Sequence, residues 1–406
     1  MNTSIGMIAH DFTGALDSLV AFVETPGDTI VLLRPEDTVG DAKNIAVVAE
    51  TQALSPAEAY TNVRDAARQL AGRQLFKRVS SSLRGNIGPE IRAVIDETGA
   101  KAIVCSALPR EGRTVIDGIG RLNSIPLHLT EYGRDPTAPC LESSLPAILR
   151  DSGIDVSSVS LDVVRRGEEA LRENLLASTS EAVVVDAETD GDLRTIGWAL
   201  VGLDTSWCAC AASGLSPHLA AALGQRGKVK GGRHLHLGNG GILAVIGSTD
   251  PTSAAQVARL VELHGTCVVR IEAPALCAGG PEVARWEEEV VHALACGRNA
   301  VLTTSLSVLI PHLRSEVAPR LGELAARVIG RDVSALVLSG GMTALKTCRA
   351  LGLASVQVLG EIEPGVVCSR GTDRDGIERT IVSKAGGFGD KRTLARLMGA
   401  GQGLNP

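Results

Sequence analysis

Aromatic residues are scarce in this sequence: phenylalanine, tryptophan and tyrosine together make up 2% of its 406 residues. This scarcity argues against a platform for single-stranded nucleic acids, because such platforms stack the bases on aromatic rings. The sequence also has no long basic run, and its formal net charge is -6. A footprint for a phosphate backbone is therefore not expected, and we expect no nucleic acid among the partners.

The nine cysteines include no CxxC pair, and the closest two, Cys208 and Cys210, lie in an apolar run typical of buried small side chains. An odd number of cysteines without a disulfide framework is typical of a reducing compartment. The N-terminus lacks a signal-like segment, and no apolar run approaches the ~18 residues of a membrane span. We therefore expect a soluble cytoplasmic protein with no membrane contact.

Short apolar runs rich in β-branched residues alternate along the chain with longer amphipathic stretches. Examples of the apolar runs are "NIAVVAE" and "SALVLSGG". Continuous apolar strands separated by helices predict an α/β fold with largely parallel sheets flanked by helices. The expected helices include 56–72, 161–177, 252–264, 316–331 and 343–352.

A glycine-rich, basic stretch, "GQRGKVKGGRHLHLGNGG" at 224–241, has neither a helical nor a strand period. Because a chain of this length normally forms more than one domain, we place a linker there. The prediction is an N-terminal domain over 1–225, a linker over 226–240 and a C-terminal domain over 241–406. Ligands of open parallel sheets bind beyond the carboxyl ends of the strands, so the loops after the apolar runs are the candidate sites.

The first such loop follows the strand expected to end near Ala9, in "IGMIAHDFTGALDS". His10 and Asp11 come directly before an expected helix. Asp11 could cap that helix, or its carboxylate could accept a proton or hold a metal. Taken alone, this loop leaves both interpretations open.

Two further loops of the N-terminal half carry arginines and hydroxyls. In "SSSLRGN" at 80–86, hydroxyl groups, a guanidinium and a glycine turn precede a helix, which is a pattern suited to a carboxylate or phosphate. Arg113 follows the next apolar run and adds a second guanidinium. Capped surface turns with solvated arginines are the alternative. The candidate binding residues are Ser80, Ser82, Arg84, Gly85, Asn86 and Arg113.

Three loops of the C-terminal half have glycines directly after apolar runs, at 245–257, 336–346 and 381–390. Each alone could be a tight turn, and none matches the GxxxxGK[ST] pattern. Together at one sheet edge they would suit the phosphates of a nucleotide. An acid held by one domain and a nucleotide held by the other, meeting in a cleft between them, would suit phosphoryl transfer.

The same motifs resemble the four-carbon acid sugar kinase family, related to 3-oxo-tetronate and threonate kinases, over nearly the whole chain. The family pattern I-A-D-D-x-T-G-A appears at 8–15, and K-K-x-D-S-T-L-R-G-N appears at 77–86. G-S-x-S-P-x-T resembles 247–253, G-G-E-T resembles 340–343, and K-S-G-G-F-G resembles 384–389.

The resemblance implies an enzyme that uses ATP with Mg²⁺ to phosphorylate a hydroxyl of a small sugar acid or oxo acid. The N-terminal domain would hold this acidic metabolite, with Asp11 or His10 as the candidate catalytic group, and the C-terminal domain would hold the nucleotide. The sequence assigns no residue to the metal, and a homodimer is one assembly open to the chain. The implied nucleotide contacts are Ser248, Gly340, Gly341, Met342, Thr343, Gly386 and Gly387.

The chain departs from the family pattern at several positions. His10 and Ser80 replace aspartates, Gln52 replaces an arginine, Met342 replaces a glutamate, and Ala385 replaces a serine. Three interpretations stay open: a kinase for a different small acid, a family member that binds its ligand without phosphoryl transfer, or an enzyme that performs another reaction on this scaffold. They differ in whether ATP is consumed and whether the acid is converted.

Overall fold

The computed structural model describes residues 3–25, 27–38, 40–135, 138–225, 240–262, 266–307, 310–330 and 333–399. The chain divides into two compact units, residues 1–228 and 229–406. This division falls inside the proposed linker, of which only Gly240 belongs to the described residues. The predicted α/β class is confirmed in both units.

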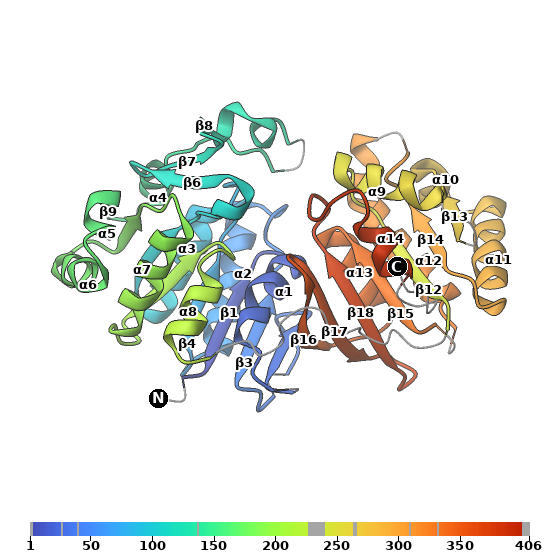
Figure 1. Cartoon of the computed structure of the whole chain (residues 1–406), viewed down its shortest axis with the longest axis horizontal. Coiled ribbons are helices and arrows are strands. Elements are labelled where there is room, and N and C mark those ends of the chain that lie inside the picture. The colour runs from blue at the N-terminus through green and yellow to red at the C-terminus, as the bar shows by residue number, and fades with distance from the viewer. Residues whose placement is uncertain are drawn as a thin grey trace. The chain divides into compact units, whose positions relative to one another are not determined.

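The large sheet of the first unit is parallel throughout (Figure 1). Its strands run in the order β2-β3-β1-β4-β11-β5-β10-β9. Apart from β4 and β9, the strands are nearly continuous apolar runs, as expected for strands covered on both faces. Their bounds are β1 Ile5–Ala9, β2 Thr29–Leu32, β3 Asn44–Val48, β4 Gln74–Arg78, β5 Lys101–Cys105, β9 Val156–Val159, β10 Ala182–Val185 and β11 Trp207–Ala211.

The helices of this unit begin at local signals in the sequence. Helix α2 starts after Ser55, which forms a reciprocal capping box with Glu58. The single helix expected over 161–177 is wrong: it is two helices, because Gly167 adopts a φ of 108° between them. The helices are α1 Phe12–Leu19, α2 Pro56–Gln69, α3 Ile87–Thr98, α4 Leu145–Asp151, α5 Leu161–Val164, α6 Glu168–Ala177, α7 Asp190–Val201 and α8 Ser216–Ala222.

A small antiparallel sheet, which the sequence did not predict, follows β5. It consists of β6 Arg113–Ile116, β7 Ile119–Leu122 and β8 Ile125–Pro126, and it lies at one end of the unit (Figure 1). The turn between β6 and β7 is held by Asp186, whose carboxylate accepts from the amides of Asp117 and Gly118 at 2.8 and 2.9 Å. Strands this short carry too few residues to show a period of two.

The sheet of the second unit has the order β13-β14-β12-β15-β18-β17-β16. The strands from β13 to β18 in that order are parallel, whereas β17 and β16 add an antiparallel edge. The expectation of a largely parallel sheet therefore holds for the part that carries the glycine loops. The bounds are β12 Ile242–Ile246, β13 Cys267–Arg270, β14 Ala300–Thr303, β15 Ala335–Ser339, β16 Ser355–Glu363, β17 Val366–Thr372 and β18 Glu378–Lys384.

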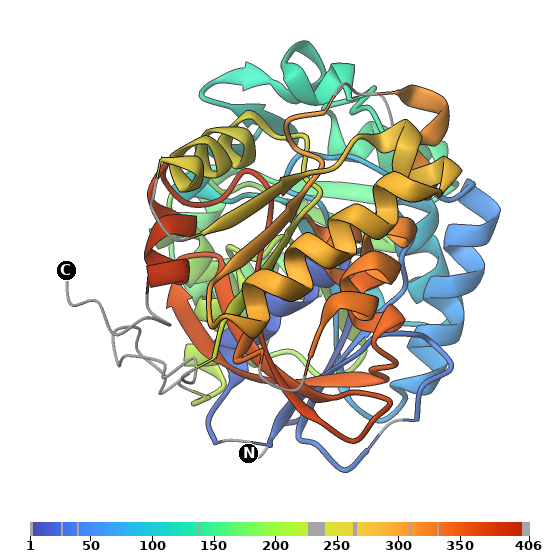
Figure 2. The same cartoon turned by 90° about the vertical axis from the view of Figure 1, so that its right-hand side faces the viewer.

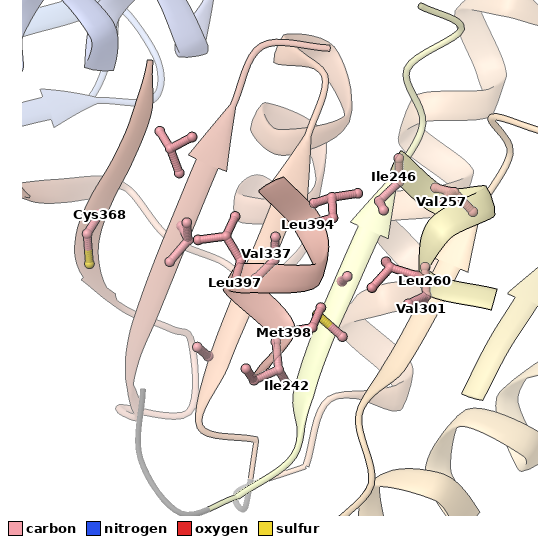
Figure 3. Packing of buried hydrophobic residues seen from close by; sticks show 14 residues of the cluster. Ile242, Ile246, Val257, Leu260, Val301, Val337, Cys368, Leu394, Leu397 and Met398 are labelled. Carbon is pink, nitrogen blue, oxygen red and sulfur yellow. The ribbon is translucent and has the colours of Figure 1, made fainter. Parts of the chain in front are cut away.

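Helices of the second unit lie in front of its strands in the side view (Figure 2). On one face of the sheet, buried side chains of α9 and α14 pack against β12, β15 and neighbouring strands (Figure 3). Val257, Leu260, Leu394 and Leu397 are 3% exposed or less, so this contact fixes α9 and α14 against the sheet. The helices are α9 Pro251–Val261, α10 Ala273–Ala278, α11 Pro281–Ala295, α12 Arg314–Val328, α13 Gly341–Ala350 and α14 Thr393–Gly399.

Among the described residues, no helix has both the length and the apolar character needed to cross a membrane.

Candidate functional site

The carboxyl ends of the central strands of the first unit lie in line. Ala9 of β1 pairs with Arg78 of β4, which pairs with Ala211 of β11, which in turn pairs with Cys105 of β5. The chain passes from β1 to β2 and β3 on one side, and then to β4 on the other side of β1. Such a reversal of strand order opens a binding crevice at the carboxyl ends of the strands. The loops after β1, β4 and β5 are those that the sequence selected.

His10 contacts both Asp11 and Arg78, an arginine that was not predicted as a site residue. Arg78 Nη1 lies 2.9 Å from His10 Nε2, and the same ring nitrogen lies 3.4 Å from Asp11 Oδ2. The other ring nitrogen, Nδ1, lies 3.4 Å from the carbonyl oxygen of Arg78. His10 is 4% exposed, so the ring is fixed between Asp11 and the end of β4.

Asp11 caps α1 with one carboxylate oxygen, and its other oxygen contacts His10. Its Oδ1 accepts from the amide of Gly14 at 2.5 Å and caps α1, while its Oδ2 faces His10. Burial alone would raise the pKa of Asp11, but His10, Arg78 and the Gly14 amide favour the charged form and hold this pKa well below its usual range. The side chain is 26% exposed, so the ionised carboxylate can be reached from solvent.

Gly14 is required for the approach of Arg78 to this cluster. A Cβ atom at position 14 would lie 2.8 Å from the guanidinium carbon of Arg78 and 2.6 Å from Asp11 Oδ1. The absence of a side chain at Gly14 therefore lets the guanidinium lie against the first turn of α1. The signal that could have identified Arg78 is its place as the last residue of β4, at the edge where ligands bind.

The serine loop after β4 contacts both predicted arginines. Arg84 Nε donates to Ser82 Oγ at 3.0 Å, and Ser82 Oγ lies 3.0 Å from Ser80 Oγ. Arg113 Nη1 donates to Ser81 Oγ, also at 3.0 Å. The segment from Arg78 to Arg84 therefore links the Asp11 cluster to both of the other guanidinium groups. The structure brings these predicted residues together.

Tyr132 lies between the two arginines and was not anticipated. The centre of its ring is 5.6 Å from the guanidinium carbon of Arg84 and 5.1 Å from that of Arg113. Its hydroxyl accepts from Arg113 Nη2 at 2.5 Å. Tyr132 belongs to the excursion that begins with the small sheet, so this excursion contributes to the site. The sequence could not identify Tyr132, because the small sheet that positions it was not predicted.

The two arginines differ in their charge compensation. Arg84 Nη1 forms an ion pair with Asp135 Oδ2 at 2.6 Å. In the described part of the chain, the side-chain contacts of Arg113 are with the neutral groups of Ser81 and Tyr132. The positive charge of Arg113 is therefore available to an anionic ligand.

Gly85 and Asn86 hold the neighbouring loop in place. The amide nitrogen of the Asn86 side chain donates to the carbonyl oxygens of Thr51 and Leu54, both at 2.9 Å. A Cβ atom at Gly85 would lie 3.3 Å from Cα of Gln52. The predicted ligand residue Asn86 therefore uses its side chain to fix the loop that carries Gln52.

Beneath this loop lies a buried ion pair. Lys77 Nζ lies 2.6 Å from Glu90 Oε2, and both side chains are 3% exposed or less. Thr51 Oγ1 donates to the other carboxylate oxygen of Glu90. Breaking a buried pair by removing one partner typically costs about 3–5 kcal/mol, so this pair anchors the loop to the sheet and to α3.

In the second unit, the three glycine loops meet at one sheet edge. The last residues of β12, β15 and β18 pair in register, as Ile246 with Ser339 and Ser339 with Lys384. Ser248, which follows β12, lies against both Gly340 and Gly386: a Cβ at Gly340 would be 3.4 Å from Ser248 Cβ, and one at Gly386 would be 2.8 Å from it.

The loop after β15 leads directly into α13. Gly340 is the N-cap residue and provides no side chain to cap the first turn, so the first amides of this ten-residue helix are left for other acceptors. Thr343 is 3% exposed and packs against Gly247, whereas Met342 is 41% exposed. Of the residues predicted here, Thr343 therefore supports the loop and Met342 faces outward.

The loop after β18 is fixed from below by Lys384, which lies in a predicted loop but was not predicted as a site residue. Lys384 is 1% exposed, and its Nζ donates to Ser339 Oγ and to the carbonyl oxygens of Ala385 and Gly386 at 3.0, 3.0 and 3.2 Å. Ser253 Oγ also donates to the carbonyl of Gly386, at 2.9 Å. The arrangement gives a rigid loop with a cation beneath it.

Replacing Gly386 by alanine is expected to weaken nucleotide binding by about 5- to 100-fold, since an added methyl group in a packed contact costs about 1–3 kcal/mol. The new Cβ would overlap Ser248 Oγ and push the two loops apart. Calorimetry with ATP measures the effect. Gly399→Ala is the matched control because no atom lies within 4 Å of its Cβ position. Equal ATP affinity in both variants would remove the Ser248–Gly386 contact from the site.

Comparison with known families divides the chain at the same place. A family model described as a sugar-binding N-terminal domain matches residues 5–219, and one described as a nucleotide-binding C-terminal domain matches residues 243–394.

Three curated relatives are kinases. A D-threonate kinase of Bordetella bronchiseptica is 31% identical, and the match covers 97% of this chain and 96% of that protein. A D-erythronate kinase of Heliobacterium modesticaldum is 29% identical, with 96% and 94% covered. A 3-oxo-tetronate kinase of Methylobacterium radiotolerans is 28% identical, with 98% and 99% covered.

Solved structures have the same fold. One from Salmonella typhimurium is 22% identical and superposes with a TM-score of 0.82 over 98% of this chain and 99% of that one. A second, from Bordetella bronchiseptica, is 29% identical with a TM-score of 0.50, and 98% of each chain is covered. It is described as a domain-swapped dimer with bound citrate.

Proposed function

The chain belongs to the four-carbon acid sugar kinase family, and on that basis we propose that it transfers the terminal phosphate of ATP to a hydroxyl of a small sugar acid or oxo acid. The observation that carries the proposal is that the loops of the first unit present one carboxylate and one guanidinium. Asp11 presents an ionised carboxylate, and Arg113 presents a guanidinium whose side-chain partners are neutral in the described part of the chain. A hydroxy acid has the complementary pair of groups.

In this proposal, Arg113 binds the carboxylate of the substrate. The hydroxyl of Tyr132 and the ion pair with Asp135 orient Arg113 and Arg84, respectively. A fixed, charged fork of N–H donors suits a carboxylate and sets the direction of the rest of the acid. The serine hydroxyls between the arginines would bond the substrate's remaining hydroxyl groups.

Asp11 orients the attacking hydroxyl. Because its pKa is held well below the usual range, its carboxylate is a weak base but a permanent acceptor at neutral pH. Phosphoryl transfer passes through a loose transition state, in which positioning the nucleophile matters more than early removal of its proton. Asp11 would accept the proton as the new P–O bond forms and the bond to ADP breaks.

The second unit would hold the nucleotide. The uncapped first turn of α13, Ser248 and the loop at Gly386 offer N–H and O–H donors at one edge, as phosphate oxygens require. Mg²⁺, when bound, neutralises phosphate charge. Asp250, whose Oδ2 lies beside Gly387, is the carboxylate that could hold it, and Mg²⁺ normally needs only one or two protein carboxylates in addition to phosphates and water.

The relatives suggest the acids to test, namely D-threonate, D-erythronate and 3-oxo-tetronate. The purified full chain is incubated with Mg-ATP and each acid, and ADP is measured, with glycerol as a control that has hydroxyls but no carboxylate. We expect ADP formation that depends on an acid and not on glycerol. Stabilisation by an acid without ADP would favour a ligand-binding protein, and conversion of an acid without ADP would favour another reaction.

We extend the proposal to a homodimer, on the precedent of the citrate-bound relative that is described as a domain-swapped dimer. The cytoplasmic location expected from the sequence remains part of the proposal. Citrate is also a small acid, as the proposed site requires.

A further inference from the structure

Lys384 is a buried cation, and no carboxylate of the described residues is among its hydrogen-bond partners. Its Nζ bonds a hydroxyl and two carbonyl oxygens, which together use the three donors of an ammonium group. A charge that is 1% exposed and bonded only to neutral acceptors is costly, and such groups are normally paired with an opposite charge. The negative charge of Asp250 acts on Lys384 without bonding it directly, so the lack of a charge partner in direct contact among the described residues is a feature to explain.

The two carbonyl bonds determine where the neighbouring amides point. In a planar trans peptide, the C=O of one residue and the N–H of the next point in opposite directions. Because the carbonyls of Ala385 and Gly386 both point toward Lys384 Nζ, the N–H groups of Gly386 and Gly387 point away from it. Within the described residues, neither N–H donates a hydrogen bond.

Two consecutive free amides that point to one side form an anion-binding concavity. Ser248 Oγ lies beside Gly386, and Asp250 Oδ2 lies beside Gly387, at the same edge as the first turn of α13. The cation beneath the loop therefore lies on the side opposite to the anion that the amides would bind, and its field crosses the loop.

We propose that Lys384 is a positioning residue that builds a phosphate site: it turns the Gly386 and Gly387 amides outward and supplies the positive charge that the bound phosphate compensates. This inference rests on the proposed nucleotide function. In it, the Lys384 ammonium makes the loop selective for phosphate. Lys384 itself has no donor left for the nucleotide.

The protonation of Lys384 offers a direct test. Burial lowers the pKa of Lys384 to about 8, although the negative charge of Asp250 acts in the opposite direction. Its remaining close partners on β15, on α9 and in the loop are neutral hydroxyls and carbonyls. Above about pH 8 the ammonium loses its charge, while the phosphates of ATP remain fully ionised.

The experiment measures binding of ATP and of adenosine to the full-length protein by calorimetry at about pH 7 and about pH 9.5. We expect ATP affinity to fall by about 10- to 100-fold at the higher pH, as for the loss of one charge several ångströms from a phosphate, whereas adenosine affinity stays constant. Lys384→Met should bind ATP this weakly at both pH values and bind adenosine normally.

Equal ATP affinity and the same pH profile in Lys384→Met would overturn this inference and leave the proposed kinase intact. Failure of the wild type to bind ATP at about pH 7 would overturn both. If Lys384→Met does not fold, the wild-type comparison still decides, because a flat ATP profile contradicts the role of the charge. Ser253→Ala removes only the second bond to the Gly386 carbonyl, so it should weaken ATP binding slightly and keep the pH dependence.

Discussion

Asp11→Asn is expected to lower kcat by about 10²- to 10⁴-fold, which is the usual contribution of a group that handles the proton of the reacting hydroxyl. The substitution keeps the shape of the side chain, and the asparagine oxygen can still accept from the Gly14 amide and cap α1. It removes the negative charge that faces His10 and Arg78. The rate of ADP formation at saturating acid and ATP measures the loss, and KM for the acid should change much less.

The matched control is Asp96→Asn. Asp96 also carries a carboxylate in hydrogen-bond contact with an arginine, Arg92, but it lies on α3 with a side chain that is 39% exposed. This variant should keep the wild-type rate, since exposed pairs contribute ~0–1 kcal/mol to stability. If Asp11→Asn retained kcat within about threefold of the wild type, Asp11 would serve only as a helix cap.

Arg113→Met is expected to lower kcat/KM for the acid by about 10²- to 10³-fold. Truncating one partner of a buried, hydrogen-bonded charge pair costs about 2–5 kcal/mol. The effect should appear mainly in KM, because the carboxylate contact is made in the ground state as well as in the transition state. Arg113→Lys keeps the charge but loses the planar guanidinium, which donates to Ser81 and Tyr132 at the same time. We therefore expect an intermediate loss of kcat/KM.

Arg121→Met is the control for the two Arg113 variants. Arg121 lies on β7 of the same small sheet and donates to the carbonyl of Ser124. It should leave KM for the acid unchanged. A normal KM in Arg113→Met would place the substrate carboxylate elsewhere, with Arg78 and Arg84 as the remaining guanidinium groups of the site.

Several parts of the site could be predicted because they depend on local pattern. Polar residues directly after apolar runs identified the loops of Asp11, Ser80–Asn86 and Arg113, since parallel strands end at a common edge. The same reasoning selected the loops at Ser248 and Gly386, and the structure places these two in contact.

Other parts of the site could not be predicted, because they depend on contacts between residues far apart in the chain. Tyr132 and Arg113 are 19 positions apart and meet only because a short antiparallel excursion folds back. Lys384 and Ser339 are 45 positions apart and meet because β15 and β18 are neighbours in the sheet. Asn86 was predicted as a ligand residue, yet its side chain bonds the backbone of a loop more than 30 positions earlier.

The sequence by itself determined the α/β class, the most regular helices and the loops that could hold an acid and a nucleotide. Each of these follows from residues close together in the chain, through apolar runs, helical periodicity and capping residues. Only the tertiary structure decided which polar side chains meet, such as Arg78 with His10 and Lys384 with the carbonyls beneath the glycine loop. The physical reason is that strand order and long-range hydrogen bonds depend on the packing of the whole unit, which no short segment encodes.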